Sequence, residues 1–250
     1  MRFLEGGGAV SRAGLRVCVL LTLVLGASGA LAEEGAPAQP AGVEAVFAGP
    51  TTSSPIVLSQ DKNFIWSVNP DDDSVSVIST RTDTEIERIQ VGNEPQSVAV
   101  DPNNRFAYVA NAAENTVSII DIDVVSPELL DGQVVKTFRT GGEPWNVVIS
   151  PNGKRVFVAN SAQDTITVLK GDVAANEVPS VLGNVRLFDP NRGDNCATSA
   201  FNHFQPRGLA VTADNSRLFV TQFLSFTRSG GKQAADNGRR AIVCRININT

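Results

Sequence analysis

The sequence has few of the residues on which most metal and redox sites depend. It contains one histidine, His203, and three cysteines among 250 residues, so a zinc site is poorly supported and no metal is expected. No Cys-x-x-Cys-His motif occurs, and haem c is therefore not attached to this segment. Charged residues make up only 19%, with a formal net charge of −5. This acidic balance does not favour nucleic acid as a partner.

Apolar residues are abundant, at 42% of the chain, which allows a sizeable core and excludes wholesale disorder. Near the N-terminus, three arginines precede an apolar run at residues 17–25, and a small-residue cleavage site ends at Ala32. This pattern predicts a secretory signal peptide over residues 1–32 and export to the periplasm or the cell surface of a bacterium. The alternative is a membrane anchor, but the run is far shorter than the ~20 residues that span a bilayer. No membrane span is expected after cleavage.

Cleavage would change the charge and the cysteine count. It removes three arginines and one glutamate from the 21 basic and 26 acidic residues, which leaves 18 and 25 and a net charge of −7. Cys18 leaves with the signal peptide, so the mature chain keeps Cys196 and Cys244. Two cysteines in an exported protein suggest one disulfide. The open alternatives are two separate thiols or partners in a segment beyond Thr250.

Residues 33–53 are rich in Ala, Gly and Pro, which predicts a linker into the first domain. The alternation at residues 43–47 could still form an edge strand that closes a sheet.

From residue 54 onward the sequence repeats. Residues 95–111 (PQSVAVDPNNRFAYVAN) and 144–160 (PWNVVISPNGKRVFVAN) are identical at seven of seventeen positions, and residues 206–222 continue the register. One position holds a large aromatic residue in every copy: Trp66, Tyr108, Phe157 and Phe219. A second position holds a side-chain amide in every copy, at separations of 42, 49 and 62 residues: Asn69, Asn111, Asn160 and Gln222. Such separations are close to the ~40–50 residues of a propeller blade.

Each copy predicts four short strands. Short β-branched runs follow at residues 73–79, 115–121 and 164–170, and a fourth run closes each unit at 85–92, 134–141 and 184–189. A sheet that is apolar on both faces is stable only between two similar sheets. We therefore expect an all-β protein, a β-propeller with blades at about 54–92, 93–141, 142–205 and 206–250. The last blade lacks its fourth strand, so we expect an N-terminal portion of a longer protein.

These residues resemble a known family. YVAN at 108–111, FVAN at 157–160 and NTVSIID from Asn115 are similar to the YVTN β-propeller repeat, and the resemblance covers residues 54–250. It implies an exported or surface protein that is most often seven-bladed when complete. Related propellers include lactonases, amine dehydrogenase subunits and nitrite reductase domains. Similarity of fold alone selects none of these functions.

Propeller geometry brings two connections to one rim: the one after each second strand and the one into the next blade. Residues just after the blade-opening proline then lie above the central channel. An aromatic and an Arg there suit a planar or anionic ligand, although Trp145 could simply pack between blades. The candidate binding residues are Gln96, Trp145, Asn146 and Arg207.

Two long insertions, at 189–205 and 223–240, fall on the same rim, and unusually long connections are often functional. A Cys196–Cys244 disulfide could tie the first insertion to the fourth blade. His203 is a further candidate for the rim, where it could be an axial ligand, a general base or an ordinary loop histidine. The loop interpretation is favoured.

No set of nucleophile, base and orienting residue is recognisable, so this segment is interpreted as a binding platform for a protein partner or a small ligand in the cell envelope rather than as an enzyme by itself. The alternative is the N-terminal propeller part of a periplasmic redox enzyme with a haem c domain downstream. A lactonase-like hydrolase is least favoured, because no acidic, Arg and His set recurs at the propeller mouth. No cofactor is expected in this segment.

Overall fold

The computed structural model describes residues 55–171, 173–174, 177–187, 204–223, 226–227, 230, 239–240 and 242–248. Within these residues the chain forms β-strands and two short 3-10 turns, η1 (Pro70–Asp72) and η2 (Ser161–Gln163). Neither turn, nor any other described segment, is a helix with the length and apolar character that crossing a bilayer demands. The predicted signal peptide, the linker with its strand at 43–47, Cys196 and His203 lie outside the described residues.

Three four-stranded antiparallel sheets follow one another, each with its strands in sequence order. The first consists of β1 (Ile56–Leu58), β2 (Phe64–Asn69), β3 (Ser74–Ser79) and β4 (Thr84–Gln90). The second consists of β5 (Pro95–Val100), β6 (Phe106–Asn111), β7 (Thr116–Ser126) and β8 (Leu129–Arg139). The third consists of β9 (Pro144–Ile149), β10 (Arg155–Asn160), β11 (Thr165–Lys170) and β12 (Ser180–Arg186).

A fourth sheet pairs three described strands, β13 (Pro206–Val211), β14 (Arg217–Gln222) and β17 (Val243–Asn247). Between β14 and β17, the strands β15 (Phe226–Thr227) and β16 (Arg239–Arg240) form a separate two-stranded ribbon. The predicted fold class is confirmed: the protein is an all-β propeller protein with three four-stranded blades and a fourth blade of three paired strands.

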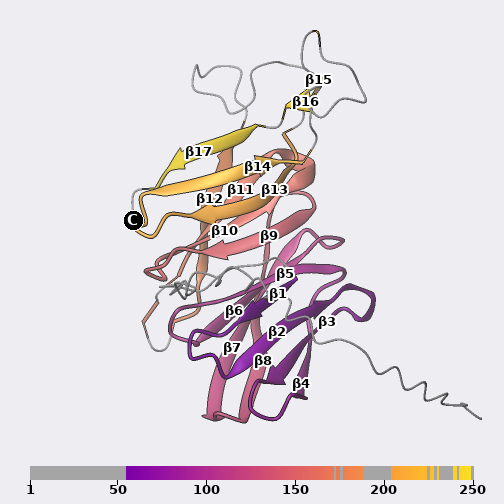
Figure 1. Ribbon diagram of the computed structural model, residues 1–250, viewed down its shortest axis with the longest axis vertical. Coiled ribbons are helices and arrows are strands. Elements are labelled where there is room, and N and C mark those ends of the chain that lie inside the picture. Colours follow the sequence, from indigo (N-terminus) through magenta and orange to yellow (C-terminus); the bar gives the residue numbers. More distant parts are fainter. Residues whose placement is uncertain are drawn as a thin grey trace, which may run out of the picture. The chain divides into compact units, whose positions relative to one another are not determined.

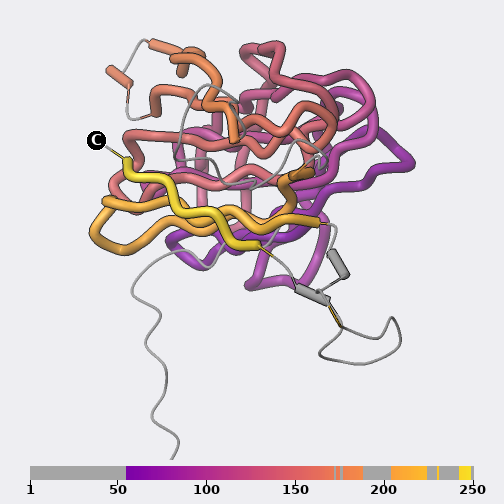
Figure 2. The backbone as a smooth tube through the Cα atoms, turned by 90° about the horizontal axis from the view of Figure 1, so that it is seen from above, coloured from indigo at the N-terminus to yellow at the C-terminus, as the bar shows by residue number. Residues whose placement is uncertain are grey.

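Neighbouring blades pack face to face, and the sheets are stacked in chain order (Figure 1). The fourth sheet packs next to the third, with β13 against β9 and β10 (Figure 2). The repeated aromatic position explains the stacking, because each of its first three members fills a different interface. Trp66 lies in the core between blades one and two, Tyr108 between two and three, and Phe157 between three and four. Burial of both faces is what the apolar strands require.

One hairpin is longer than the sequence predicted. β7 and β8 pair as far as Ser126 and Leu129, whereas the runs expected from sequence were 115–121 and 134–141. Pro127, Gly132 and several acidic residues made the intervening segment look like a loop. The ladder continues because Leu130 is buried against the first two blades and Glu87 of β4 accepts a hydrogen bond from the backbone N–H of Gly132 at 3.0 Å.

Candidate functional site

Two kinds of connection meet at one rim of the stack. The turn after each second strand carries Asp73, Asn115 or Asp164, and the connection into the next blade carries Glu94, Glu143 or Gln205. All six residues have φ between 48° and 57°, a left-handed conformation that is uncommon outside glycine. The residues pair in chain order, Asp73 with Glu94, Asn115 with Glu143 and Asp164 with Gln205. In each pair the side-chain Oδ1 of the turn residue accepts a hydrogen bond from the backbone N–H of the residue in the connection, at 2.7–2.8 Å. These bonds hold one blade to the next.

A blade-opening proline follows each left-handed residue of the connections between blades, that is Glu94, Glu143 and Gln205. A β-bulge follows each of these prolines. Pro95 pairs with Asn111 and Ser97 with Ala110, so Gln96 has no residue opposite it. Trp145 in blade three stands at the equivalent bulge, and Arg207 in blade four lies within a wider one. Bulges re-aim side chains that would otherwise follow the pleat. Three of the residues predicted for the rim therefore share one repeat position and are all partly exposed.

Arg207 reaches from blade four onto the aromatic residue of blade three. Its guanidinium carbon lies 3.3 Å from the centroid of the Trp145 ring and 4.5 Å from that of Phe223. A guanidinium stacked on aromatic rings gains cation–π attraction that strengthens as water is excluded. The structure thus brings Trp145 and Arg207 together, as the sequence suggested for a single rim site.

The polar contacts of Arg207 are incomplete. Its Nη2 donates to Oε1 of Glu143 at 3.4 Å, the single ion pair that the described residues provide for it. Its Nε and Nη1 are buried and have no hydrogen-bond partner among the described residues. Burial lowers the pKa of Arg207, and the Glu143 carboxylate opposes this effect by favouring the charged form. Arg207 remains a cation, but a poorly solvated and under-bonded one.

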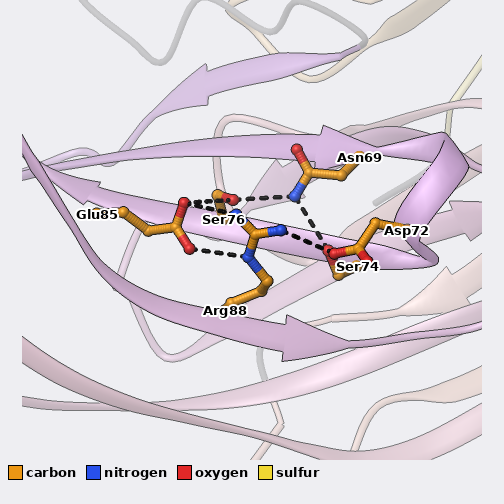
Figure 3. Close-up of polar contacts among 6 residues, drawn as sticks. All are labelled: Asn69, Asp72, Ser74, Ser76, Glu85 and Arg88. Carbon is orange, nitrogen blue, oxygen red and sulfur yellow. Dashed lines mark hydrogen bonds and ion pairs between the residues drawn. The ribbon is translucent and has the colours of Figure 1, made fainter. Parts of the chain in front are cut away.

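Gln222 shows a second deficiency in the same blade. In the first three blades this position is an asparagine whose Nδ2 donates to two hydroxyl groups on the next strand. Figure 3 shows the arrangement in blade one, where Asn69 bonds Ser74 and Ser76, and Arg88 joins Glu85 and Asp72 to the same network. Gln222 is only 6% exposed, yet within the part of the chain that the structure describes its Oε1 and Nε2 have no partner.

The register explains why Gln222 lacks these bonds. Asn160 lies opposite Thr165 and bonds both Thr165 and Thr167, and Thr167 stands opposite Val158. In blade four, Cys244 stands opposite Val220 and the backbone N–H of Gln222 bonds the carbonyl of Ile242. Ile242 and Cys244 therefore occupy the two hydroxyl positions.

The other predicted site residues are placed differently or lie outside the described residues. Asn146 is 7% exposed and pairs with Ala159 inside the blade, so it is not presented at the rim surface. Gln96 occupies the equivalent bulge one blade away from Trp145. His203 and Cys196 lie outside the described residues. Cys244 is buried on β17, and its predicted bridge to Cys196 stays a prediction.

Sequence reasoning missed Glu143, Phe223 and Gln222 as members of the site. Glu143 directly precedes a blade-opening proline, and the polar residues at that position in other copies, Glu94 and Gln205, were a usable signal. Gln222 interrupts an otherwise constant asparagine, which was a second signal. Phe223 had none, since it begins a long connection whose course only the fold determines. No group of three or more His, Cys, Asp or Glu residues suited to a metal ion occurs in the described part of the chain.

The fold and this rim define the chain as a β-propeller protein, and comparisons with known proteins agree. The family model "Lactonase, 7-bladed beta-propeller" matches residues 36–133, which is less than half of the chain. No curated protein matches the chain.

Several solved structures resemble the chain. Hydrazine synthase of Kuenenia stuttgartiensis is 20% identical with a TM-score of 0.54, over 82% of this chain and 52% of that one. A protein of unknown function from Desulfotomaculum acetoxidans is 20% identical with a TM-score of 0.52, over 68% and 51%. A protein from Lactobacillus plantarum is 16% identical with a TM-score of 0.53, over 76% and 56%. The chain spans about half the length of these structures, and the similarities show the fold alone.

Proposed function

We propose that this protein is an exported β-propeller of the YVTN-repeat kind that acts as a binding platform in the periplasm or at the surface of a bacterium. The observation that carries the proposal is Arg207, a partly buried cation held against two aromatic rings at the rim, with two buried nitrogen atoms that no described residue bonds. Native proteins leave few buried polar groups unpaired, and each exception calls for an explanation. A protein segment or a small ligand seated on this rim would supply the missing acceptors.

The rim suits binding because packed blades hold its side chains in place. Trp145 and Arg207 project from bulges in two sheets that share one hydrophobic core. Side chains that are positioned before a partner arrives lose less conformational entropy on binding. A flat ring beside a guanidinium favours a partner with a planar or anionic group.

Export is tested by expressing the full chain in a bacterial host, fractionating the cells and sequencing the N-terminus of the product. A product in the envelope or medium that begins at Glu33 is expected. A cytoplasmic product that retains residues 1–32 would refute the export part of the proposal.

The platform is tested by affinity capture from the envelope extract with three matched baits: the wild type, Arg207→Ala and Arg81→Ala. Arg81 forms an exposed ion pair with Glu128 at 3.5 Å and serves as the control. A partner captured by the wild type and by Arg81→Ala but lost with Arg207→Ala supports the proposal. No partner, or a partner that all three baits capture equally, contradicts a binding site at Arg207.

Lactone hydrolysis is the second candidate function, and the match of residues 36–133 to the lactonase propeller family favours it. The structure adds a carboxylate, Glu143, next to Arg207 at the rim. As a general base it could take a proton from a water molecule that attacks a lactone carbonyl polarised by Arg207. Assaying a lactone panel with the wild type and Glu143→Gln decides the matter. Hydrolysis that the substitution abolishes supports this function, and no hydrolysis by the wild type rejects it.

The redox alternative, an N-terminal propeller coupled to a haem c domain, rests on the sequence resemblance. The similarity to hydrazine synthase is one of fold and adds no residue in support. Reading the gene beyond Thr250 for a Cys-x-x-Cys-His motif tests this alternative directly.

A further inference from the structure

Blade four carries two polar side chains with unmet hydrogen bonds, the partly buried Arg207 and the buried Gln222, and they lie on paired strands. Arg207 follows Pro206 on β13, and Pro206 stands opposite Gln222 on β14. Nε and Nη1 of Arg207 and both amide atoms of Gln222 lack partners. Asn111 and Asn160 each leave only their Oδ1 unpaired, because their Nδ2 bonds two hydroxyls. The unmet hydrogen bonds are therefore concentrated in blade four, where Gln222 replaces the asparagine of the other copies.

From this arrangement we propose that the rim at Arg207 and Gln222 binds a small organic carboxylate that carries a flat apolar group. The proposal rests on the proposed binding function and names the chemistry of its ligand. The guanidinium has donors and no acceptor, so the ligand must supply acceptors. A carboxylate provides two, in the planar geometry that a guanidinium matches.

The charge already present at the site opposes the binding of every anion, so charge alone does not select the ligand. The Glu143 carboxylate is bonded to Arg207 at 3.4 Å and repels every incoming anion. The rings beside the guanidinium must therefore contribute to binding, which favours an anion with a flat apolar group over bare phosphate. Glu143 uses only Nη2 of the guanidinium, through a long bond, and so acts as a resident competitor that an incoming carboxylate can displace.

Trp145 and Phe223 provide the apolar surroundings. Trp145 lies flat against the guanidinium, and the Phe223 ring lies 4.5 Å from it. Phe223 is 58% exposed, so moving it away exposes little additional apolar surface. We take its ring as the cover that yields when the ligand enters. The flat group of the ligand then packs where that ring lay.

The test uses benzoate as the probe, with benzamide as the neutral analogue and inorganic phosphate as an anion without an apolar group, measured by titration calorimetry on the full mature chain. Tryptophan fluorescence gives a second readout, because the chain has two tryptophans and Trp66 is buried between blades one and two. Saturable benzoate binding that shifts the emission, with weaker binding of benzamide and phosphate, is expected.

Three variants locate the binding. Arg207→Ala should weaken benzoate binding by at least roughly tenfold, the loss of one charge-assisted hydrogen bond. Glu143→Gln should tighten it, because the competing charge is gone while the bulge and backbone remain. Arg81→Ala should leave it unchanged. The Glu143→Gln result keeps the test decisive if Arg207→Ala proves poorly folded by circular dichroism.

Absent benzoate binding, equal binding of benzamide or phosphate, or weaker benzoate binding by Glu143→Gln would each overturn the proposal. If benzoate does not bind but a protein partner is captured through Arg207, the ligand class is wrong and the platform function stands. If benzoate binds as expected and no partner is captured, the carboxylate site stands and the ligand of the rim is a small molecule alone.

Discussion

The Oδ1 atom of Asn115 accepts a hydrogen bond from the backbone N–H of Glu143 at 2.7 Å, and this bond joins the second blade to the third at the rim. Asp73 and Asp164 make the same bond in their blades, to the backbone of Glu94 and Gln205. Both partners have left-handed backbones, which asparagine and aspartate tolerate better than most residues. The bond orients Glu143, and through Glu143 it supports Arg207.

Replacing Asn115 with glycine should lower the unfolding free energy by about 1 kcal/mol. Glycine accepts the positive φ of 57°, so the loss reports the hydrogen bond and not backbone strain. Asp83→Gly is the matched control, since Asp83 also has a positive φ and its side chain makes no hydrogen bond among the described contacts. Chemical denaturation measures both, and equal effects of the two substitutions would contradict a role for the bond.

The repeated aromatic position should show graded stability losses. Phe157 is 4% exposed in the core between blades three and four, so Phe157→Ala should destabilise the protein by about 3–5 kcal/mol. Phe219 holds the same repeat position on β14 but is only partly buried, and Phe219→Ala should lower stability by about 1–2 kcal/mol. Urea unfolding checks the ranking, which a larger loss at Phe219 would reverse.

Glu87 should make stability depend on pH. Burial raises the pKa of Glu87 and is the largest effect, the hydrogen bond from the Gly132 N–H lowers it by less, and the nearby Asp131 adds the smallest effect, which raises it. A carboxyl with a higher pKa in the folded state binds its proton more tightly when folded. Its unfavourable contribution is therefore complete above the folded-state pKa and disappears as pH falls below the unfolded one.

Glu87→Gln should accordingly be more stable than the wild type at pH 7, with the difference shrinking on acidification toward pH 4. Asp131→Asn should reduce the same difference, because it removes a charge that raises the pKa of Glu87. Thermal denaturation across this pH range measures both effects. A difference that grows as the pH falls would show that the sign is wrong.

The predicted Cys196–Cys244 bridge should leave the mature exported chain without free thiols. Thiol titration under denaturing, non-reducing conditions should find none, and two after reduction. By the chain-entropy model, closing the roughly 50-residue loop contributes about 4 kcal/mol, so reductant should lower the unfolding free energy by up to that amount. Two free thiols before reduction would refute the bridge.

Much of the fold was readable in the sequence because it is a repeat. Prolines, aromatics and asparagines recur at the separations of a four-stranded unit, and each strand is determined largely by its own residues. The β7–β8 hairpin was predicted too short, because Pro127 and Gly132 look like loop residues when the neighbouring blade is not known. The burial of Leu130 and the hydrogen bond between Glu87 and Gly132, both made with the neighbouring blade, extend the ladder.

The candidate site was predicted in part. Trp145 and Arg207 were found because they share a repeat position, whereas Glu143 and Phe223 join them through contacts between blades and along an irregular connection. By itself, then, the sequence determined the β-propeller class and the position from which the rim residues project, since both follow from local periodicity. The tertiary structure alone decided that Arg207 lies on Trp145 with two of its nitrogen atoms unbonded by any described residue. Burial and hydrogen-bond satisfaction depend on segments that are far apart in the chain and meet only in the folded protein.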